Sequence, residues 1–444
     1  MTRTTIPIAV ARTTASDAID SDSMELQFSA PPPLALYIHV PWCVRKCPYC
    51  DFNSHEAKTI IPEDEYVAAL IADLESALPQ IWGRIVSSIF IGGGTPSLFS
   101  PEAYDTLLAA VRARVNLQAD AEITLEANPG TVEAAKFAGF RNAGINRVSL
   151  GIQSFDDAKL RSLGRIHSAD EARRAIDLAL QHFDRVNLDL MYALPEQKLK
   201  QAEADMKEAI SRGTEHLSAY HLTLEPNTPF HHSPPPLPDD DLSADMQLMV
   251  EEFFAAAGYE HYETSAFAKR GGRCRHNLNY WNFGDFLGIG AGAHGKLTVP
   301  AAGPSQGGDS VKPGGQASPG RTGVTPARGA GDGGWVHQVV REMRRKHPRD
   351  YLNGAQRGDF ILERRNVTAT ELPFEFMMNA LRLTEGFPSR LFDERTGLPL
   401  ARVHAELLKA QRDGFIEVTA ERITPTLRGQ RFLNTLLQSF LRDA

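Results

Sequence analysis

The sequence predicts an α/β fold: a partial, TIM-like (β/α)6 barrel followed by a smaller, winged-helix-like α+β domain. Six short apolar runs of β-forming residues recur along the first half of the chain, and helix-like segments separate them, as in repeated βαβ units. Five of these runs lead into a polar or glycine-rich cluster, which is where a parallel barrel gathers its functional groups. The six runs are residues 34–40, 87–93, 121–127, 146–152, 185–191 and 216–222.

The composition is that of a soluble globular chain. Of 444 residues, 42% are hydrophobic and 23% are charged, and this length suggests one large domain plus something smaller. The formal net charge of −8 gives no basic excess that would attract nucleic acid. No apolar run approaches the ~20 residues that a membrane span needs. We therefore expect a cytoplasmic protein with no nucleic-acid partner.

Residues 1–30 are expected to form a disordered tail. They are rich in Thr, Ser, Ala and Asp and lack the apolar core of a secretory signal. A mitochondrial presequence is disfavoured because Asp17, Asp20 and Asp22 stand among few basic residues.

The barrel and the loop that follows it are expected over residues 31–300, with helices over 63–78 and 168–183 among its connections. Residues 301–334 differ, since eleven are Gly and four are Pro. That composition is typical of disorder, so we expect a disordered insertion there and an ordered domain over 335–444.

The C-terminal domain is expected to contain amphipathic helices over 371–386 and 401–414, a hairpin over 414–426 and a closing helix over 432–441. Helix, helix, hairpin, helix resembles a winged helix, which would suggest DNA binding. Residues 366–444, however, carry ten Lys and Arg against ten Asp and Glu. We therefore favour packing or partner docking for this domain.

Three of the four cysteines, Cys43, Cys47 and Cys50, fall within eight residues. A disulfide scaffold would spread its cysteines, so this clustering favours a metal or redox site. The spacing C-x3-C-x2-C suits a short loop whose thiolates wrap an iron–sulfur cluster, and three ligands would leave a fourth iron open. The alternative is a zinc knuckle completed by His39 or His55.

The segment YIHVPWCVRKCPYCDFNSH, residues 37–55, resembles the radical S-adenosylmethionine superfamily. More narrowly, the chain is similar to the oxygen-independent coproporphyrinogen III oxidase family and, within it, to the haem chaperone branch called HemW. The similarity continues in order through the motifs IFIGGGTPSL, ITLEANPGTVE, NRVSLGIQSF, NLDLMYALPEQ and HNLNYW. It covers the chain from about residue 34 onward, apart from the insertion. It implies a radical S-adenosylmethionine barrel with a 4Fe-4S cluster on the three cysteines.

The resemblance also implies a set of residues that bind S-adenosylmethionine at the strand ends. Glycines let a backbone approach a ligand closely, and a carboxylate can accept hydrogen bonds from ribose hydroxyls. For the tyrosines and the acid at 189, a purely structural role is the alternative, and a contact from Thr223 is a less certain extension. The set is Tyr37, Tyr49, Gly93, Gly94, Thr95, Glu126, Gln153, Arg165 and Asp189.

The HNLNYW motif lies outside the barrel strands, and the resemblance makes it a candidate haem site. An imidazole can ligate haem iron and aromatic rings can stack on a porphyrin. The alternative is an aromatic segment that closes the barrel around a satisfied histidine. The candidate haem residues are His276, Asn277, Tyr280, Trp281 and, as a second ligand, Cys274.

Two functions compete. One is a haem chaperone that passes haem to acceptor proteins, and the other is a coproporphyrinogen III dehydrogenase that decarboxylates propionates by radical chemistry. The oxidases carry a further cysteine two residues after the third, where this chain has Phe52, so the chaperone is favoured and no catalytic residue is assigned. A radical enzyme acting on another substrate stays open.

The resemblance implies several partners. Haem is the expected cargo, and haem-acceptor proteins, among them respiratory membrane enzymes, are the expected recipients. A one-electron donor such as a flavodoxin and a homodimer are further expectations. The location expected is the cytoplasm, with peripheral association at the inner membrane face as a further option.

Overall fold

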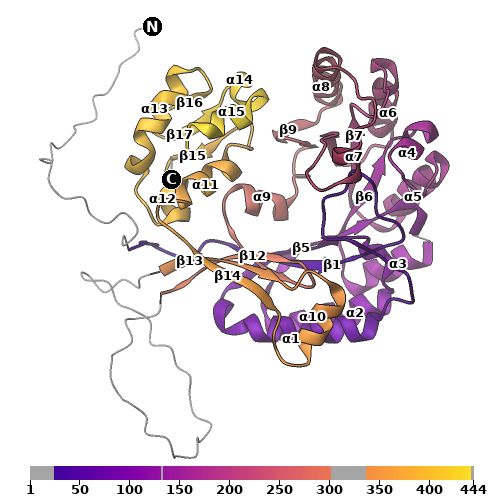
Figure 1. Ribbon diagram of the computed structural model, residues 1–444, viewed down its shortest axis with the longest axis horizontal. Helices are drawn as coiled ribbons and strands as arrows, with labels where there is room; N and C mark the ends of the chain where they lie inside the picture. Colours follow the sequence, from indigo (N-terminus) through magenta and orange to yellow (C-terminus); the bar gives the residue numbers. More distant parts are fainter. Residues whose placement is uncertain (1–24, 132–133, 302–336, 442–444) are drawn as a thin grey trace, which may run out of the picture.

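The computed structural model describes residues 25–131, 134–301 and 337–441. Nearly all of the expected tail and of the expected insertion lies outside these ranges. Figure 1 shows a large sheet with helices packed along its outer side and a smaller lobe formed by the C-terminal residues.

The six expected strands are present, and consecutive strands pair in parallel. Their inward and outward faces are both covered, and accordingly most of their residues are buried. Because all six run the same way, their carboxyl ends meet at one rim of the barrel. The strands are β1 (Leu34–Val40), β4 (Ile85–Gly93), β5 (Asn116–Ala127), β6 (Arg147–Gln153), β7 (Arg185–Tyr192) and β8 (His216–His221).

Helices cover the outside of the barrel. The expected helices appear as α1 and α5, and α5 begins with a capping box in which the Ser168 hydroxyl accepts from Glu171 N while the Glu171 carboxylate accepts from Ser168 N. The covering helices are α1 (Glu63–Ile81), α2 (Pro101–Arg114), α3 (Ala134–Ala143), α4 (Asp157–Ser162), α5 (Ala169–His182), α6 (Leu199–Ser211) and α8 (Asp240–Ala256). The short helix α7 (Pro229–His232) lies instead against the cysteine loop, where Phe230 N donates to the Pro48 carbonyl at 3.0 Å. Within the described residues, none of the helices combines the length and the hydropathy required to cross a bilayer.

Six further strands extend the sheet to twelve. On one side β11 (Asp285–Ile289) pairs in parallel with β1, and β12 (His294–Pro300), β13 (His337–Arg344) and β14 (Ile361–Val367) follow in antiparallel order. On the other side β10 (Ala266–Ala268) and β9 (Glu260–Glu263) follow β8. The two-stranded pair β2 (Trp42–Cys43) and β3 (His55–Glu56) stands apart, after β1.

The C-terminal lobe contains helices around a three-stranded sheet, and it has a separate core that includes Phe376, Phe387 and Phe392. Leu26, from the range assigned by sequence to the tail, is buried in this core. The lobe's elements are α11 (Leu372–Ala380), β15 (Phe387–Pro388), α12 (Arg390–Thr396), α13 (His404–Arg412), β16 (Ile416–Val418), β17 (Arg422–Pro425), α14 (Leu427–Arg431) and α15 (Leu433–Gln438).

The expected helices of the lobe are shorter than predicted, and the one expected over 401–414 is α13, which begins only at His404 and ends at Arg412. The helix expected over 371–386 ends at Ala380, because the chain then turns to meet the edge strand β9 through a bridge between Leu383 and Glu263. The expected closing helix is replaced by α14 and α15, which are separated at Phe432.

The lobe thereby contacts both ends of the open sheet. It continues directly from β14 at one edge, and its residues 382–384 exchange backbone hydrogen bonds with Tyr262 and Thr264 at the other edge. Helix α9 (Arg275–Trp281) lies between the lobe and the barrel (Figure 1) and contacts β1, β4 and α11.

Candidate functional site

A cavity of about 370 Å³ opens at the carboxyl ends of the parallel strands. Residues at the carboxyl ends of the six strands, or in the segments that follow them, line it, as expected for a parallel barrel. Eleven of the residues proposed by sequence for the cluster and the cofactor share this cavity. They are Cys43, Cys47, Cys50, Tyr49, Gly93, Gly94, Thr95, Glu126, Gln153, Arg165 and Asp189.

The three cysteines lie on one loop, which the pairing of β2 with β3 closes. The Cys50 amide donates to the Cys47 carbonyl at 3.1 Å, which turns the loop back between the second and third cysteines. Burial raises the pKa of Cys43 and of Cys50. Without metal both are therefore neutral thiols at pH 7, and metal binding would release their protons.

The loop fits a cluster better than a single ion. Across the three described ranges, no three His, Cys, Asp or Glu side chains are placed to hold one metal ion, as a zinc site requires. Both ring nitrogens of His39 are engaged, Nδ1 with the Tyr37 hydroxyl at 3.0 Å and Nε2 with the Asn53 carbonyl at 2.8 Å. In a four-iron cluster each thiolate binds a different iron, so the sulfurs need not converge on one point.

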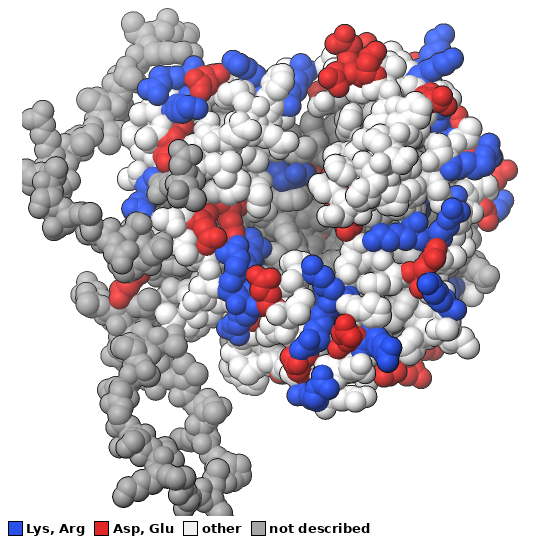
Figure 2. All heavy atoms as spheres, viewed as in Figure 1, with Lys and Arg blue, Asp and Glu red and all other residues white. Residues whose placement is uncertain are grey.

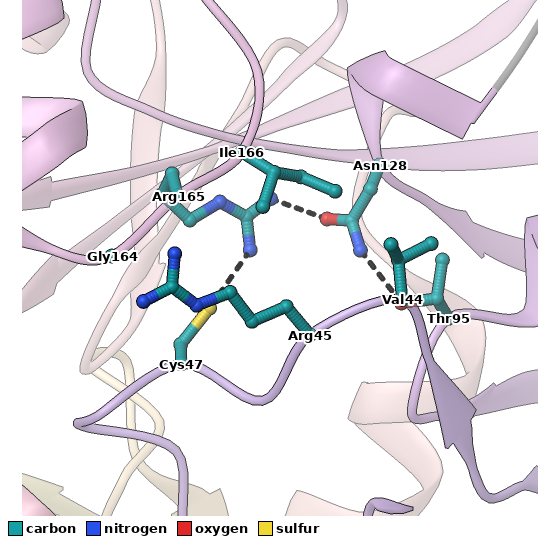
Figure 3. A pocket seen from close by; sticks show the side chains of 8 residues that line it. All are labelled: Val44, Arg45, Cys47, Thr95, Asn128, Gly164, Arg165 and Ile166. Carbon is teal, nitrogen blue, oxygen red and sulfur yellow. Dashed lines mark hydrogen bonds between the residues drawn. The ribbon is translucent and has the colours of Figure 1, made fainter. Parts of the chain in front are cut away.

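Arg165 connects the cysteine loop to the strand ends (Figure 3). Its Nη1 lies 3.6 Å from Cys47 Sγ, and its Nη2 donates to Asn128 Oδ1 and, at 2.8 Å, to the Gly151 carbonyl. Asn128 in turn donates to Thr95 Oγ1 at 2.9 Å. The Nε of Arg165 is buried and has no hydrogen-bond partner among the described residues. The guanidinium therefore places a fixed positive charge beside a thiolate position.

The two glycines at the end of β4, Gly93 and Gly94, are required by close contacts. Gly93 has φ +116°, and a Cβ there would lie 2.4 Å from His39 Cε1. A Cβ on Gly94 would lie 2.5 Å from the Trp42 carbonyl oxygen. Only glycine therefore lets this turn lie against the start of the cysteine loop.

Among the carboxylates that line the cavity, Glu126 and Asp189 lie on the strands β5 and β7, and neither has a basic partner in hydrogen-bond contact among the described residues. Burial and the charge of Asp189 raise the pKa of Glu126 to about 7, against a hydrogen bond from Gly93 N at 3.1 Å. Burial also raises the pKa of Asp189, which accepts from Ser149 Oγ at 2.7 Å and Asn187 Nδ2 at 2.9 Å. These groups suit a ligand that donates hydrogen bonds or carries positive charge.

Three residues that were predicted to bind S-adenosylmethionine differ in how they lie relative to the cavity. Tyr37 does not line the cavity, since its hydroxyl is held by His39 and its ring stacks on Phe90. Tyr49 lies in the cavity wall against Phe230. Gln153 has φ +66°, an uncommon conformation for a residue other than glycine, and such strain is concentrated at ligand sites.

The candidate haem residues lie elsewhere, on and next to α9, and do not line this cavity. His276 is 2% exposed, and its ring packs between Phe90 and Tyr280 with centroids 5.1 Å away in each case. Its Nδ1 lies 3.1 Å from Ser88 Oγ, whereas Nε2 has no partner among the described residues. Burial lowers its pKa to about 3, so the ring is neutral.

The other candidates in this segment differ in exposure. Cys274 is fully buried, with Sγ 3.4 Å from Glu122 Oε1. Asn277, Tyr280 and Trp281 are half-buried. The segment closes the base of the barrel, as the alternative interpretation of HNLNYW expected, while one nitrogen of its histidine is left unpaired.

Sequence reasoning missed several residues that line the cavity. Asn128, Ser149 and Tyr220 contribute to the wall, and Glu225 lies beyond β8. Two of these residues could have been found from the sequence, because alternate strand residues point to the same face. Asn128 lies two residues after Glu126, and Ser149 lies four residues before Gln153 on β6.

Comparison with known proteins identifies the same family that the sequence motifs resemble. The family model "Radical SAM superfamily" matches residues 37–209, and "HemN C-terminal domain" matches residues 367–432. The chain is 47% identical to "Heme chaperone HemW" of Escherichia coli (strain K12), over 93% of this chain and 99% of that protein. It is 46% identical to "Heme chaperone HemW" of Haemophilus influenzae with the same coverage.

More distant similarity extends to a mouse protein and to a solved structure. "Radical S-adenosyl methionine domain-containing protein 1, mitochondrial" of Mus musculus is 40% identical over 61% of this chain and 62% of that protein. The structure of coproporphyrinogen III oxidase (HemN) from Escherichia coli superposes with a TM-score of 0.72, covering 92% of this chain and 90% of that chain. At 20% identity this superposition shows a shared fold.

Proposed function

This chain belongs to the radical SAM superfamily and, within it, to the HemW family, and from this premise we propose that it binds haem and passes it to acceptor proteins. The relatives that span nearly its whole length are named haem chaperones. Sequence identity near one half over 93% of the chain supports carrying that role over.

The proposed cofactors are a 4Fe-4S cluster on Cys43, Cys47 and Cys50 and S-adenosylmethionine in the adjoining cavity. Such a cluster supplies an electron and one iron that an amine and a carboxylate can chelate. On the protein side, Arg165 offsets thiolate charge, the glycine turn admits a ligand backbone, and Glu126 and Asp189 accept hydrogen bonds. The residues present therefore fit both groups.

One observation carries the choice between chaperone and oxidase. Phe52 lines the cavity and is 59% exposed, at the position where the oxidases carry a further cysteine. A phenyl ring offers neither a thiol nor a proton. Coproporphyrinogen III dehydrogenation is therefore the second candidate, favoured only by the intact cofactor pocket.

Haem is proposed to bind near α9. On the face drawn in Figure 2, the surface is hollowed between the C-terminal lobe and the part of the barrel that carries α8, which gives a route toward α9. Direct ligation by His276 requires α9 to move away from β4, because the ring is almost fully buried against Phe90. Tyr280 and Trp281 are half-buried and offer ring surface without that movement.

The proposed partners follow from this role. Acceptors include respiratory membrane enzymes, a flavodoxin-like protein supplies single electrons, and a homodimer is the proposed assembly. The proposed location is the cytoplasm, with peripheral contact at the inner membrane face. Acidic and basic side chains are interspersed over the face in Figure 2, with no single-sign patch that would suit nucleic acid.

An anaerobic assay of the reconstituted protein with coproporphyrinogen III separates the two candidates. The chaperone proposal expects no protoporphyrinogen and a haem complex that transfers to an acceptor. Sustained formation of protoporphyrinogen would contradict the chaperone role.

A haem titration followed by absorbance tests the α9 assignment. His276→Ala is expected to change the Soret band and weaken binding, while the matched control His261→Ala, outside the motif, leaves both unchanged. Identical titrations for His276→Ala and the unmodified protein would remove His276 from the haem site.

A further inference from the structure

The cysteine loop is attached at its far end to a part of the sheet that is remote in sequence. Asn53 follows the third cysteine, and its Nδ2 donates to two backbone carbonyls, Ala291 O at 3.0 Å and Lys346 O at 2.8 Å. The first acceptor lies in the β11–β12 turn, residues 290–293, and the second between β13 and α10 (Pro348–Ala355). One amide group thus ties the loop to two later segments.

The β11–β12 turn is shaped to receive this amide. Gly292 has φ +84°, and a Cβ there would lie 2.1 Å from Asn53 Nδ2. Gly290 has φ +102°, and a Cβ there would lie 2.4 Å from the His39 carbonyl oxygen. Both glycines therefore serve close approach to the segment that carries the cysteines.

The β11–β12 turn is itself held in place by two side chains of α1, Tyr66 and Asp73. Tyr66 on α1 donates to the His39 carbonyl and accepts from Ala291 N, both at 2.8 Å. The buried Asp73 carboxylate accepts from Gly290 N at 3.1 Å and pairs with Arg344 at 3.1 Å. Because the turn is fixed by these bonds, it can hold the Asn53 side chain in one position.

The other contact of Asn53 acts through its backbone. His39 Nε2 lies 2.8 Å from the Asn53 carbonyl. Because a carbonyl oxygen only accepts, Nε2 carries the proton, and the neutral ring accepts the Tyr37 hydroxyl at Nδ1. Asn53 is therefore fixed on its backbone by the end of β1 and on its side chain by the turn.

We propose that Asn53, seated against Gly292, is a positioning residue that latches the end of the cysteine loop to the β11–β12 turn and so keeps Cys47 and Cys50 facing the cavity. This inference rests on the proposed function, since the loop geometry matters for what the thiolates hold. It assigns a role to the GIGAGAH segment, residues 288–294, none of whose residues lines the cavity.

Asn53→Ala and Gly292→Ala test the latch from its two sides. In the metal-free protein, alkylation of Cys47 and Cys50 by iodoacetamide is followed by mass spectrometry, with the buried Cys274 as an internal reporter of global unfolding. We expect both variants to speed alkylation of the loop cysteines about tenfold while Cys274 stays protected. In the reconstituted protein, iron release to a ferrous chelator is also expected to rise about tenfold, as for residues that orient metal ligands.

Asn146→Ala is the matched control, since Asn146 Nδ2 also donates to a backbone carbonyl, Ala121 O at 2.8 Å, but at the opposite end of the barrel. It is expected to leave alkylation and iron release unchanged. Native alkylation and iron-release rates in both latch variants would overturn the proposal. If the unmodified protein takes up no iron, the cluster assignment fails, and the alkylation rates alone decide for or against the latch.

Discussion

Two carboxylates on β5, four residues apart, meet opposite surroundings. At the base of the barrel Glu122 accepts from Arg185 at 2.8 Å, and the charges of Arg147 and Arg185 outweigh its burial and lower its pKa. At the rim Glu126 lacks a basic contact among the described residues, and burial with the charge of Asp189 raises its pKa to about 7. A paired buried acid maintains the architecture, whereas one left unpaired at a cavity is available to a ligand.

The two ends of the barrel are joined by a chain of hydrogen bonds. Cys274 N donates to the Tyr262 hydroxyl at 3.3 Å, which lies 2.8 Å from His216 Nε2. His216 Nδ1 lies 2.5 Å from Asn187 Oδ1, and Asn187 Nδ2 donates to Asp189 at 2.9 Å. The groups at the base of the barrel are thus linked by hydrogen bonds to Asp189, which lies at the rim and has no basic contact among the described residues.

The largest effect is expected from Glu122→Gln, which removes the charge that compensates Arg147 and Arg185. Breaking a buried ion pair on one side costs roughly 3 to 5 kcal/mol of stability. Urea unfolding at pH 7 measures the loss. Glu203→Gln, which breaks an exposed pair with Lys207, is the control and should change little. A loss no larger than in that control would show that the charge of Glu122 does not stabilise the base of the barrel.

Glu126→Gln is expected to have the opposite sign at alkaline pH. Because the pKa of Glu126 is raised, the folded protein binds this proton more tightly than the unfolded chain, and stability falls as pH rises from about 4.5 to about 7. The neutral amide removes that cost of roughly 3 kcal/mol at pH 8 in the metal-free protein. Unfolding at pH 5 and pH 8 is the measurement, and an equal difference between variant and native protein at both values would contradict the raised pKa.

Tyr262→Phe interrupts the chain between base and rim. It leaves His216 Nε2 and the Cys274 amide without their partner, which costs about 1 to 3 kcal/mol. Chemical unfolding measures the loss. Tyr104→Phe, which removes a single bond to the Pro96 carbonyl, is the control and is expected to lose less. Unchanged stability of Tyr262→Phe would mean that these hydrogen bonds between base and rim do not contribute to the stability of the fold.

The smallest effect on the fold is expected at the rim, from Arg165→Lys. A single ammonium cannot contact Cys47, Asn128 and Gly151 together as the guanidinium does. We expect S-adenosylmethionine affinity, measured by equilibrium dialysis on the reconstituted protein, to fall about tenfold, or about 1.4 kcal/mol, with unfolding unchanged. Arg161→Lys, exposed on α4, is the control. Native affinity in Arg165→Lys would remove Arg165 from the pocket.

Local sequence patterns were sufficient to predict much of the fold and of the cavity. The six parallel strands were predictable because buried parallel strands are continuous apolar runs, and most cavity residues were predictable because they lie at or near the carboxyl ends of those strands. The latch at Asn53 was not, because its acceptors lie more than two hundred residues away. The burial of His276 could not be predicted either, since its packing against Ser88 and Phe90 depends on how α9 enters the barrel.

The bridge between Leu383 and Glu263 has a consequence for how the chain is made. The two outer strands of the sheet are protected differently: β14 carries exposed charged residues, whereas β9 is shielded by contacts from the lobe. On the ribosome, β9 therefore emerges more than a hundred residues before the segment that shields it. During that interval an open strand edge is available for wrong pairing, so folding of the nascent barrel is expected to depend on how soon the C-terminal lobe follows.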